Sequence, residues 1–192
     1  MLVLALAVTV AACGSSKKSS GGGGGGAAAT TQSAADARSA ATGDIPDNQV
    51  FLTFKDAAAG YSISYPEGWA RRGGANDTTF QDKANVIHIV VTKGAQPSPA
   101  DVQADLTRLK ASDPAVKAGP VQKVTLKGQA VLKVVYTTKS GPNPVTGKRV
   151  PLTVDRYYYS KGGRRASVDL GTAVGVDNVD AYRLISQSFK WR

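Results

Sequence analysis

Short runs in which apolar and polar residues alternate dominate residues 45–192, and this pattern is typical of β-strands. In the run YSISY, the side chains of Tyr61, Ile63 and Tyr65 fall on one side and the two serines on the other, as a period of two requires. The run VIHIVVT at 86–92 is apolar on both sides, which predicts a central strand covered on both faces. Further strands are expected at 50–55, 77–82, 121–126, 130–138, 152–160 and 165–171.

Two segments instead show the signals of helices. Ser98-Pro99-Ala100-Asp101 supplies a capping hydroxyl, a proline at the first helical position and an acid near the helix start. Val102, Leu106 and Leu109 then recur at helical spacing. A second helix is expected near the end of the chain, with Asp177 as its cap.

The connections between the later strands indicate antiparallel pairing. Lys127-Gly128 and Lys161-Gly162-Gly163 are short enough to be hairpin turns, whereas 140–150 is a longer loop with two prolines. Strands, one helix, a run of antiparallel strands and a terminal helix together predict an α+β fold.

The segment GYSISYPEGW, together with a late helix running into SQSFKW, is similar to the PsbP-like domains. This resemblance spans 45–192, and its specific part is the ten-residue signature. It implies a central antiparallel β-sheet flanked by helices, an α/β/α sandwich, with a non-catalytic binding or assembly role. The residues themselves indicate that Tyr61, Ile63, Tyr65 and Trp69 pack in the core.

The beginning of the chain carries the pattern of an export signal. Residues 2–12 are apolar or small and too few to cross a bilayer core of about 20 residues. The sequence VAAC resembles the lipobox of bacterial lipoproteins, which implies a signal peptide at 1–12 and a lipid-modified Cys13, acylated for example with palmitate. Because no Lys or Arg precedes the apolar run, we expect the natural start to lie upstream.

A Gly-, Ser- and Ala-rich tract separates Cys13 from the predicted domain. Residues 13–44 are therefore expected to be the lipidated cysteine and a flexible tether, with a reach of about 30 Å. This organisation predicts a lipid-anchored protein on the extracytoplasmic face of the cell membrane.

Few residue types that perform chemistry are present. A single Cys and a single His exclude an internal disulfide and a Cys/His zinc site, and no cofactor or metal is expected. His88 lies within the apolar run VIHIVV, so a hydrogen-bonded core histidine is expected rather than a catalytic base. The acids are scattered or sit at helix starts, and the sequence predicts no enzyme.

The charge is strongly positive, at +10, of which residues 45–192 carry +9. Candidate polyanion-binding residues occur as three pairs, namely Arg71-Arg72, Lys148-Arg149 and Arg164-Arg165. Outside the membrane such a surface would meet an envelope protein or an anionic wall polymer, and nucleic acid is not an expected partner. The same pairs also suit a solvated surface that keeps the protein soluble, and both interpretations stay open.

Two functional hypotheses follow from these observations. The first is a non-catalytic binding or assembly module of the envelope, and the alternative is a carrier of a small apolar ligand or lipid. The aromatic run Tyr157-Tyr158-Tyr159 bears on both, since alternate rings point to opposite faces of a strand. We expect these rings to be covered by a helix.

Overall fold

The computed structural model describes residues 43–143 and 145–192, and its largest element is an eight-stranded antiparallel sheet. Its strands are β3 (Ala70–Gly74), β4 (Asp77–Asp82), β5 (Asn85–Lys93), β6 (Lys117–Ala118), β7 (Gln122–Leu126), β8 (Gln129–Lys139), β9 (Pro151–Lys161) and β10 (Arg164–Ala173). They lie in the order β3-β4-β5-β10-β9-β8-β6, and β7 also pairs with β8.

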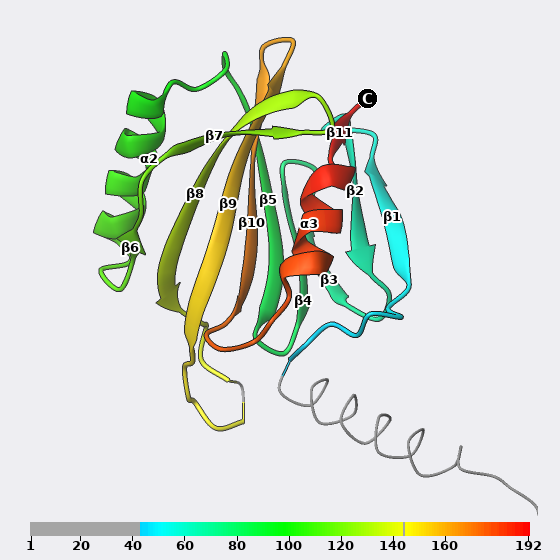
Figure 1. Cartoon of the computed structure of the whole chain (residues 1–192), viewed down its shortest axis with the longest axis vertical. Coiled ribbons are helices and arrows are strands. Elements are labelled where there is room, and N and C mark those ends of the chain that lie inside the picture. The colour runs from blue at the N-terminus through cyan, green and yellow to red at the C-terminus, as the bar shows by residue number, and fades with distance from the viewer. Residues whose placement is uncertain (1–42, 144) are drawn as a thin grey trace, which may run out of the picture.

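Two helices and one small sheet complete the fold (Figure 1). The small sheet contains β1 (Phe51–Asp56), β2 (Tyr61–Pro66) and β11 (Lys190–Trp191) in the order β1-β2-β11. Helix α2 (Pro99–Ser112) packs on one face of the large sheet, and helix α3 (Val179–Ser188) packs on the other together with the small sheet. We refer to these two faces as the α2 face and the α3 face.

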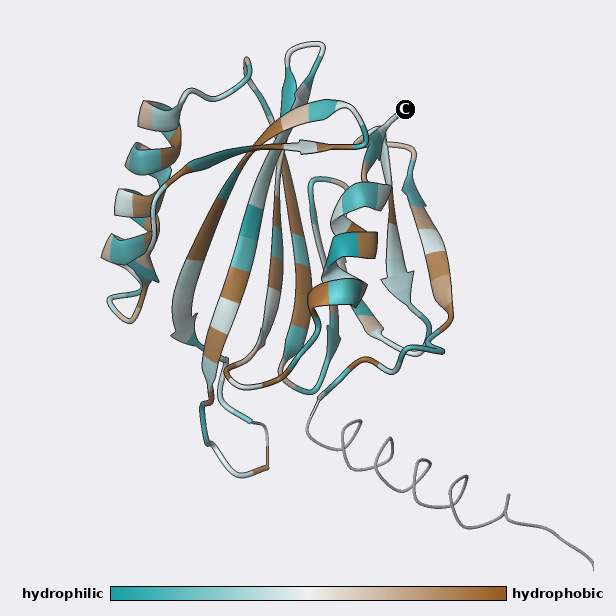
Figure 2. Ribbon diagram, viewed as in Figure 1, coloured by the Kyte–Doolittle hydropathy of each residue, from teal (hydrophilic) through white to brown (hydrophobic). Residues whose placement is uncertain are grey.

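Alternation along the strands divides the core between the two faces, as the succession of hydrophobic and hydrophilic bands along the strands shows (Figure 2). Tyr157 and Tyr159 belong to the cluster on the α3 face, whereas Tyr158 packs with α2. All three rings are buried, which confirms the expectation that they are covered. Tyr61 and Ile63 are fully buried as predicted, and Tyr65 stacks on Phe80 with a centroid distance of 4.3 Å.

The start of α2 is the capping box that the sequence predicts. The Ser98 hydroxyl accepts a hydrogen bond from the Asp101 backbone at 3.2 Å, and the Asp101 carboxylate accepts one from the Ser98 backbone at 2.8 Å. The buried residues Val102 and Leu106 face the sheet. The box thereby fixes where α2 begins and which side it presents.

The predicted cap of the second helix is wrong by one residue. Asn178, not Asp177, is the N-cap of α3, and its side chain makes no capping hydrogen bond. Its amide is used inside the protein instead, where it donates to Thr172 at 2.9 Å and to Asn85 at 3.1 Å. Asp177 still contributes to the helix start, because its carboxylate accepts a hydrogen bond from the Val179 backbone at 3.2 Å.

The antiparallel sheet and the two helices are confirmed, but the predicted sandwich is incomplete. Three strands, β3, β6 and β11, were not expected, and the small sheet shares the α3 face with α3. Strand β5 is central as predicted, yet Val86, His88 and Val90 on its α2 face are only half-buried. The prediction that β5 is covered on both faces is therefore wrong, because α2 packs over β8 and β9 instead.

The predicted signal peptide 1–12, Cys13 and nearly all of the predicted tether lie outside the described residues. Within the ranges that are described, neither helix is long and apolar enough to cross a membrane.

Candidate functional site

A row of polar side chains crosses the α2 face of the large sheet, one from each of five neighbouring strands. Strand register places Arg72 opposite Thr79, Thr79 opposite His88, His88 opposite Asp169, and Asp169 opposite Arg156. Directly opposed residues of antiparallel strands lie on the same face with neighbouring side chains. The register of four strand pairs therefore builds a continuous polar row.

The inner end of this row is a buried ion pair. The Arg156 guanidinium donates to both carboxylate oxygens of Asp169, at 2.6 and 2.7 Å, and both side chains are at most 10% exposed. Burial alone lowers the pKa of Arg156, but the hydrogen bonds and the charge of Asp169 outweigh it and raise that pKa above its ordinary value. Arg156 is therefore a permanent buried cation with a matched bidentate partner.

Asp105 of α2 connects this pair to the helix. Its carboxylate accepts a hydrogen bond from Arg156 at 3.1 Å and one from the Tyr158 hydroxyl at 2.7 Å. Burial raises the pKa of Tyr158, so its hydroxyl stays protonated and donates. The expectation that the acids are scattered is wrong for Asp105 and Asp169, because strand pairing and helix packing bring both to one guanidinium.

His88 is not the buried core residue that its apolar neighbours predict. Its side chain is 35% exposed, with Nε2 2.9 Å from Asp77 and Nδ1 3.9 Å from Asp169. The reason is the open part of the α2 face, where no helix covers β5. Carboxylates thus face both ring nitrogens, and among the described residues no Ser, Thr or Cys side chain hydrogen-bonds to this imidazole.

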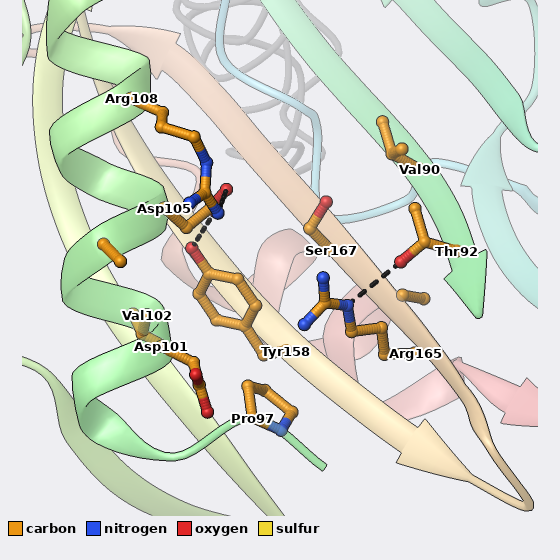
Figure 3. A pocket seen from close by; sticks show the side chains of 12 residues that line it. Val90, Thr92, Pro97, Asp101, Val102, Asp105, Arg108, Tyr158, Arg165 and Ser167 are labelled. Atoms are coloured by element: carbon orange, nitrogen blue, oxygen red, sulfur yellow. Dashed lines mark hydrogen bonds and ion pairs between the residues drawn. The ribbon is translucent and has the colours of Figure 1, made fainter. Parts of the chain in front are cut away.

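A cleft of about 260 Å³ lies between α2 and the sheet, beside the polar row (Figure 3). We call it the α2 cleft. Residues of α2 form one wall, and residues of β5, β9 and β10 form the other. The lining residues that carry charge or a hydroxyl are Thr92, Asp101, Asp105, Arg108, Tyr158, Arg165 and Ser167.

Arg165 is the main cation on the sheet wall of the α2 cleft. Its Nε donates to the Thr92 hydroxyl at 3.0 Å, and its two terminal nitrogens point into the cleft (Figure 3). Gly94 makes room for this side chain, because a Cβ atom there would lie 3.3 Å from the Arg165 Nε. The backbone amide of Gly94 also donates to the carbonyl of Gly163 at 2.8 Å, which fixes the end of β5 to the β9–β10 turn.

The three predicted basic pairs do not form one patch. Arg71 lies over the Phe54 ring on the α3 side at 5.2 Å, whereas Arg72 belongs to the row on the α2 face. Lys148-Arg149 precedes the first residue of β9, and Arg164-Arg165 follows its last residue, so an 11-residue strand of about 30 Å separates these two pairs. Neighbours in sequence within a strand point to opposite faces, which the pair pattern alone does not reveal.

Arg164 instead joins two lysines that were not singled out in the sequence. Register places Lys93 opposite Arg164 and Arg164 opposite Lys161, and we call these three residues the hairpin row. Lys93 and Lys161 are exposed, and Arg164 packs over Trp191 at 4.9 Å. None of the ion pairs recorded between described residues includes a member of this row.

A second, larger cavity of about 540 Å³ lies on the α3 face. Leu170, Tyr157 and Tyr182 supply apolar walls, and the ion pair between Lys133 and Asp155 at 2.7 Å lies at its edge. This cavity was not predicted from the sequence, because it depends on how α3 and the β7–β8 hairpin sit over the sheet.

The buried ion pair generates a prediction about stability. Asp169→Asn removes the charge that balances Arg156, and a buried cation without its partner costs about 3–5 kcal/mol. We expect the free energy of unfolding, measured by urea denaturation monitored by circular dichroism, to fall by about 3 kcal/mol or more.

Asp77→Asn is the matched control, since Asp77 is 67% exposed and an exposed pair contributes about 1 kcal/mol or less. Equal losses for the two variants would contradict a dominant role of the Arg156–Asp169 pair.

Comparisons with known proteins bear on the fold. No protein family model matches the sequence, and no curated protein matches it. Among solved structures, the chain is similar to the solution structure of cyanobacterial PsbP (CyanoP) from Synechocystis sp. PCC 6803, with a TM-score of 0.57 and 17% identity, over 78% of this chain and 98% of that one. It is also similar to a crystal structure from Bacteroides thetaiotaomicron VPI-5482, with a TM-score of 0.50 and 13% identity, over 73% of this chain and 48% of that one.

At these identities the likeness concerns the arrangement of the backbone. It supports the resemblance first indicated by GYSISYPEGW and the late SQSFKW. The chain has a PsbP-like fold.

Proposed function

We propose that the chain is a lipid-anchored, extracytoplasmic binding module, without catalytic activity, that docks on an anionic polymer of the cell envelope. The hairpin row is the observation that carries this proposal. Three cations stand side by side at one end of the sheet, and directly opposed like charges destabilise a strand pair. A partner that carries negative charges would relieve this repulsion.

The contacts of Arg164 support a binding role for this end of the sheet. Its guanidinium donates to the backbone carbonyl of Ala59 at 3.1 Å and to a backbone oxygen of Arg192 at 3.2 Å, and no Asp or Glu side chain among the described residues pairs with it. Lys93 and Lys161 flank it on exposed strand ends. The resulting positive potential attracts polyanions with a strength that depends on salt.

Anchoring belongs to the same proposal and rests on the sequence. Cys13 in VAAC is the expected lipid attachment site, and two or three acyl chains hold a protein stably on a bilayer. A tether with a reach of about 30 Å would let the domain contact polymers beyond the headgroups.

The double variant Lys93→Gln/Lys161→Gln tests the docking surface. We expect the affinity for linear inorganic polyphosphate, measured by fluorescence anisotropy, to fall at low salt. The slope of log K against log salt concentration should fall in magnitude by about 0.7 for each lysine, the value for flexible single strands.

Lys148→Gln/Arg149→Gln is the matched control, because it removes the same charge at the other end of β9. Equal losses in the two double variants would show a diffuse charge effect and overturn the hairpin row as the docking surface. A photo-crosslinker at position 161 in cells separates the partners, since recovery of one discrete protein in place of polymer would argue against the polymer.

Cys13→Ser tests the anchor. Cells grown with a radiolabelled fatty acid should label the natural chain and not the variant, and the variant should appear in the medium or in the soluble envelope fraction. An unlabelled natural chain would refute lipid anchoring and leave the docking surface to be judged separately.

A carrier of a small apolar ligand is the second candidate function, favoured by the cavity of about 540 Å³ on the α3 face. Pockets for small ligands have volumes of about 300–1,000 Å³ and mostly apolar walls. The volume of this cavity lies within that range, and Leu170, Tyr157 and Tyr182 supply apolar walls.

Filling this cavity tests the carrier hypothesis. Ala173 lines the cavity, so Ala173→Trp should abolish binding of Nile red, measured by its fluorescence, and should remove any lipid found by native mass spectrometry. Ala70→Trp on the exposed strand β3 is the control. Unchanged dye binding by Ala173→Trp, or no bound molecule in the natural chain, would exclude this function.

A further inference from the structure

The α2 cleft is lined by opposite charges, and two of them, Asp101 and Arg165, are not paired with each other. Its charged lining consists of Asp101, Asp105 and Arg108 on α2 and Arg165 on the sheet, so its formal charge is zero. Asp105 is occupied by Arg156 and Tyr158, and Arg108 lies 3.6 Å from its other oxygen. The charges still open to a ligand are therefore Asp101 on one wall and Arg165 on the other.

Arg165 keeps donor capacity directed into the cleft. Only its Nε has a recorded partner within the described residues, the Thr92 hydroxyl. The two terminal nitrogens face the space between Tyr158 and Ser167 (Figure 3). A planar fork of this kind binds a carboxylate through two parallel hydrogen bonds. The Ser167 hydroxyl is a further donor on the same wall.

Asp101 offers the complementary negative charge. One of its oxygens accepts from the Ser98 backbone at 2.8 Å, and the same oxygen accepts from the Ser98 hydroxyl at 2.8 Å. These hydrogen bonds to Ser98 lower the pKa of Asp101, and the positive charge of Arg165 lowers it further. The carboxylate is ionised, and its second oxygen has no recorded hydrogen bond among the described residues.

Arg165 and Asp101 line one cleft, yet no ion pair within 4.0 Å joins them in the described structure. We infer that the α2 cleft binds a small apolar zwitterion, an amino acid or short peptide, whose carboxylate meets Arg165 and whose ammonium meets Asp101. The body of this ligand would contact the apolar lining, which comprises Val90, Pro97, Val102 and Ala104. The cleft volume of about 260 Å³ lies below the range of about 300–1,000 Å³ for drug-sized ligands, so the cleft suits only a small molecule.

This site is independent of the docking surface proposed above. The hairpin row lies on the other side of the strands, since Arg164 and Arg165 alternate in direction. A polyanion would also be repelled by Asp101 and Asp105, whereas a zwitterion satisfies both walls. Loss of one activity therefore leaves the other intact.

The test measures binding to the full chain in detergent micelles, with ¹⁵N-labelled arginine side chains as the readout. The probes are L-alanine and L-alanyl-L-alanine, which separate a free amino acid from a peptide as the source of the zwitterion. We expect one of them to shift the Arg165 signal saturably. N-acetyl-alanine lacks the ammonium and alaninamide lacks the carboxylate, and each should bind at least tenfold more weakly.

Matched variants locate the site, and their affinities are measured by isothermal titration calorimetry because the Arg165 variants carry no Arg165 signal. Arg165→Gln and Asp101→Asn should each weaken binding of the zwitterion at least tenfold, and Arg165→Lys, which keeps the charge but loses the fork, should also weaken it. If Asp101→Asn disturbs the helix cap, Asp101→Glu, which keeps the charge, is the variant to compare with it. Lys161→Gln, from the hairpin row, should bind the zwitterion normally.

Two results would overturn the inference. Equal binding of N-acetyl-alanine and L-alanine would show an anion site without a role for Asp101. The absence of saturable shifts with either zwitterion at millimolar concentration would show that Asp101 and Arg165 are hydrated and bind no zwitterion.

Discussion

The register of the β9–β10 hairpin is the constraint on which the rest of the structure depends. Ten directly opposed residue pairs fix it, from Arg164 opposite Lys161 to Ala173 opposite Leu152. A slip by one residue would turn every side chain of one strand to the other face. Arg156 would then lose Asp169, and a buried guanidinium without its carboxylate is far more costly than a shifted apolar contact. The ion pair and the apolar alternation thus select the same register, which makes the register unique.

The same register also separates two electrostatic environments on one protein. On the α2 face, Asp105 and Asp169 balance Arg156, and the cleft beside them has no net formal charge. At the end of the hairpin, three cations face each other without an Asp or Glu partner among the described residues. The net charge of +10 therefore does not describe a uniformly basic surface. A ligand with both charges suits the first environment, and a polyanion suits the second.

Much of this arrangement follows from local sequence, and the rest depends on packing. The strands, the Ser98–Asp101 capping box and the two hairpin turns are encoded within a few residues of each other. Once the turn at 161–164 is fixed, counting back along both strands places Arg156 opposite Asp169, so the ion pair was accessible to sequence reasoning that followed the register. Which face α2 covers is not a local property, and that choice decides that His88 is half exposed and that Asp105 reaches Arg156.

The position of α2 also explains why the polar row is stable without being fully covered. Only Arg156 and Asp169 lie deep, and they neutralise each other before the row reaches the open strands. Toward the edge, His88 of the row and its hydrogen-bond partner Asp77 are increasingly exposed, so their contact contributes little to stability. The most buried residues of the row therefore have the closest ionic partners, and the more exposed residues have weaker ones. This gradient leaves the strand surface beside α2 accessible, and it is this accessible strip that the α2 cleft uses as its sheet wall.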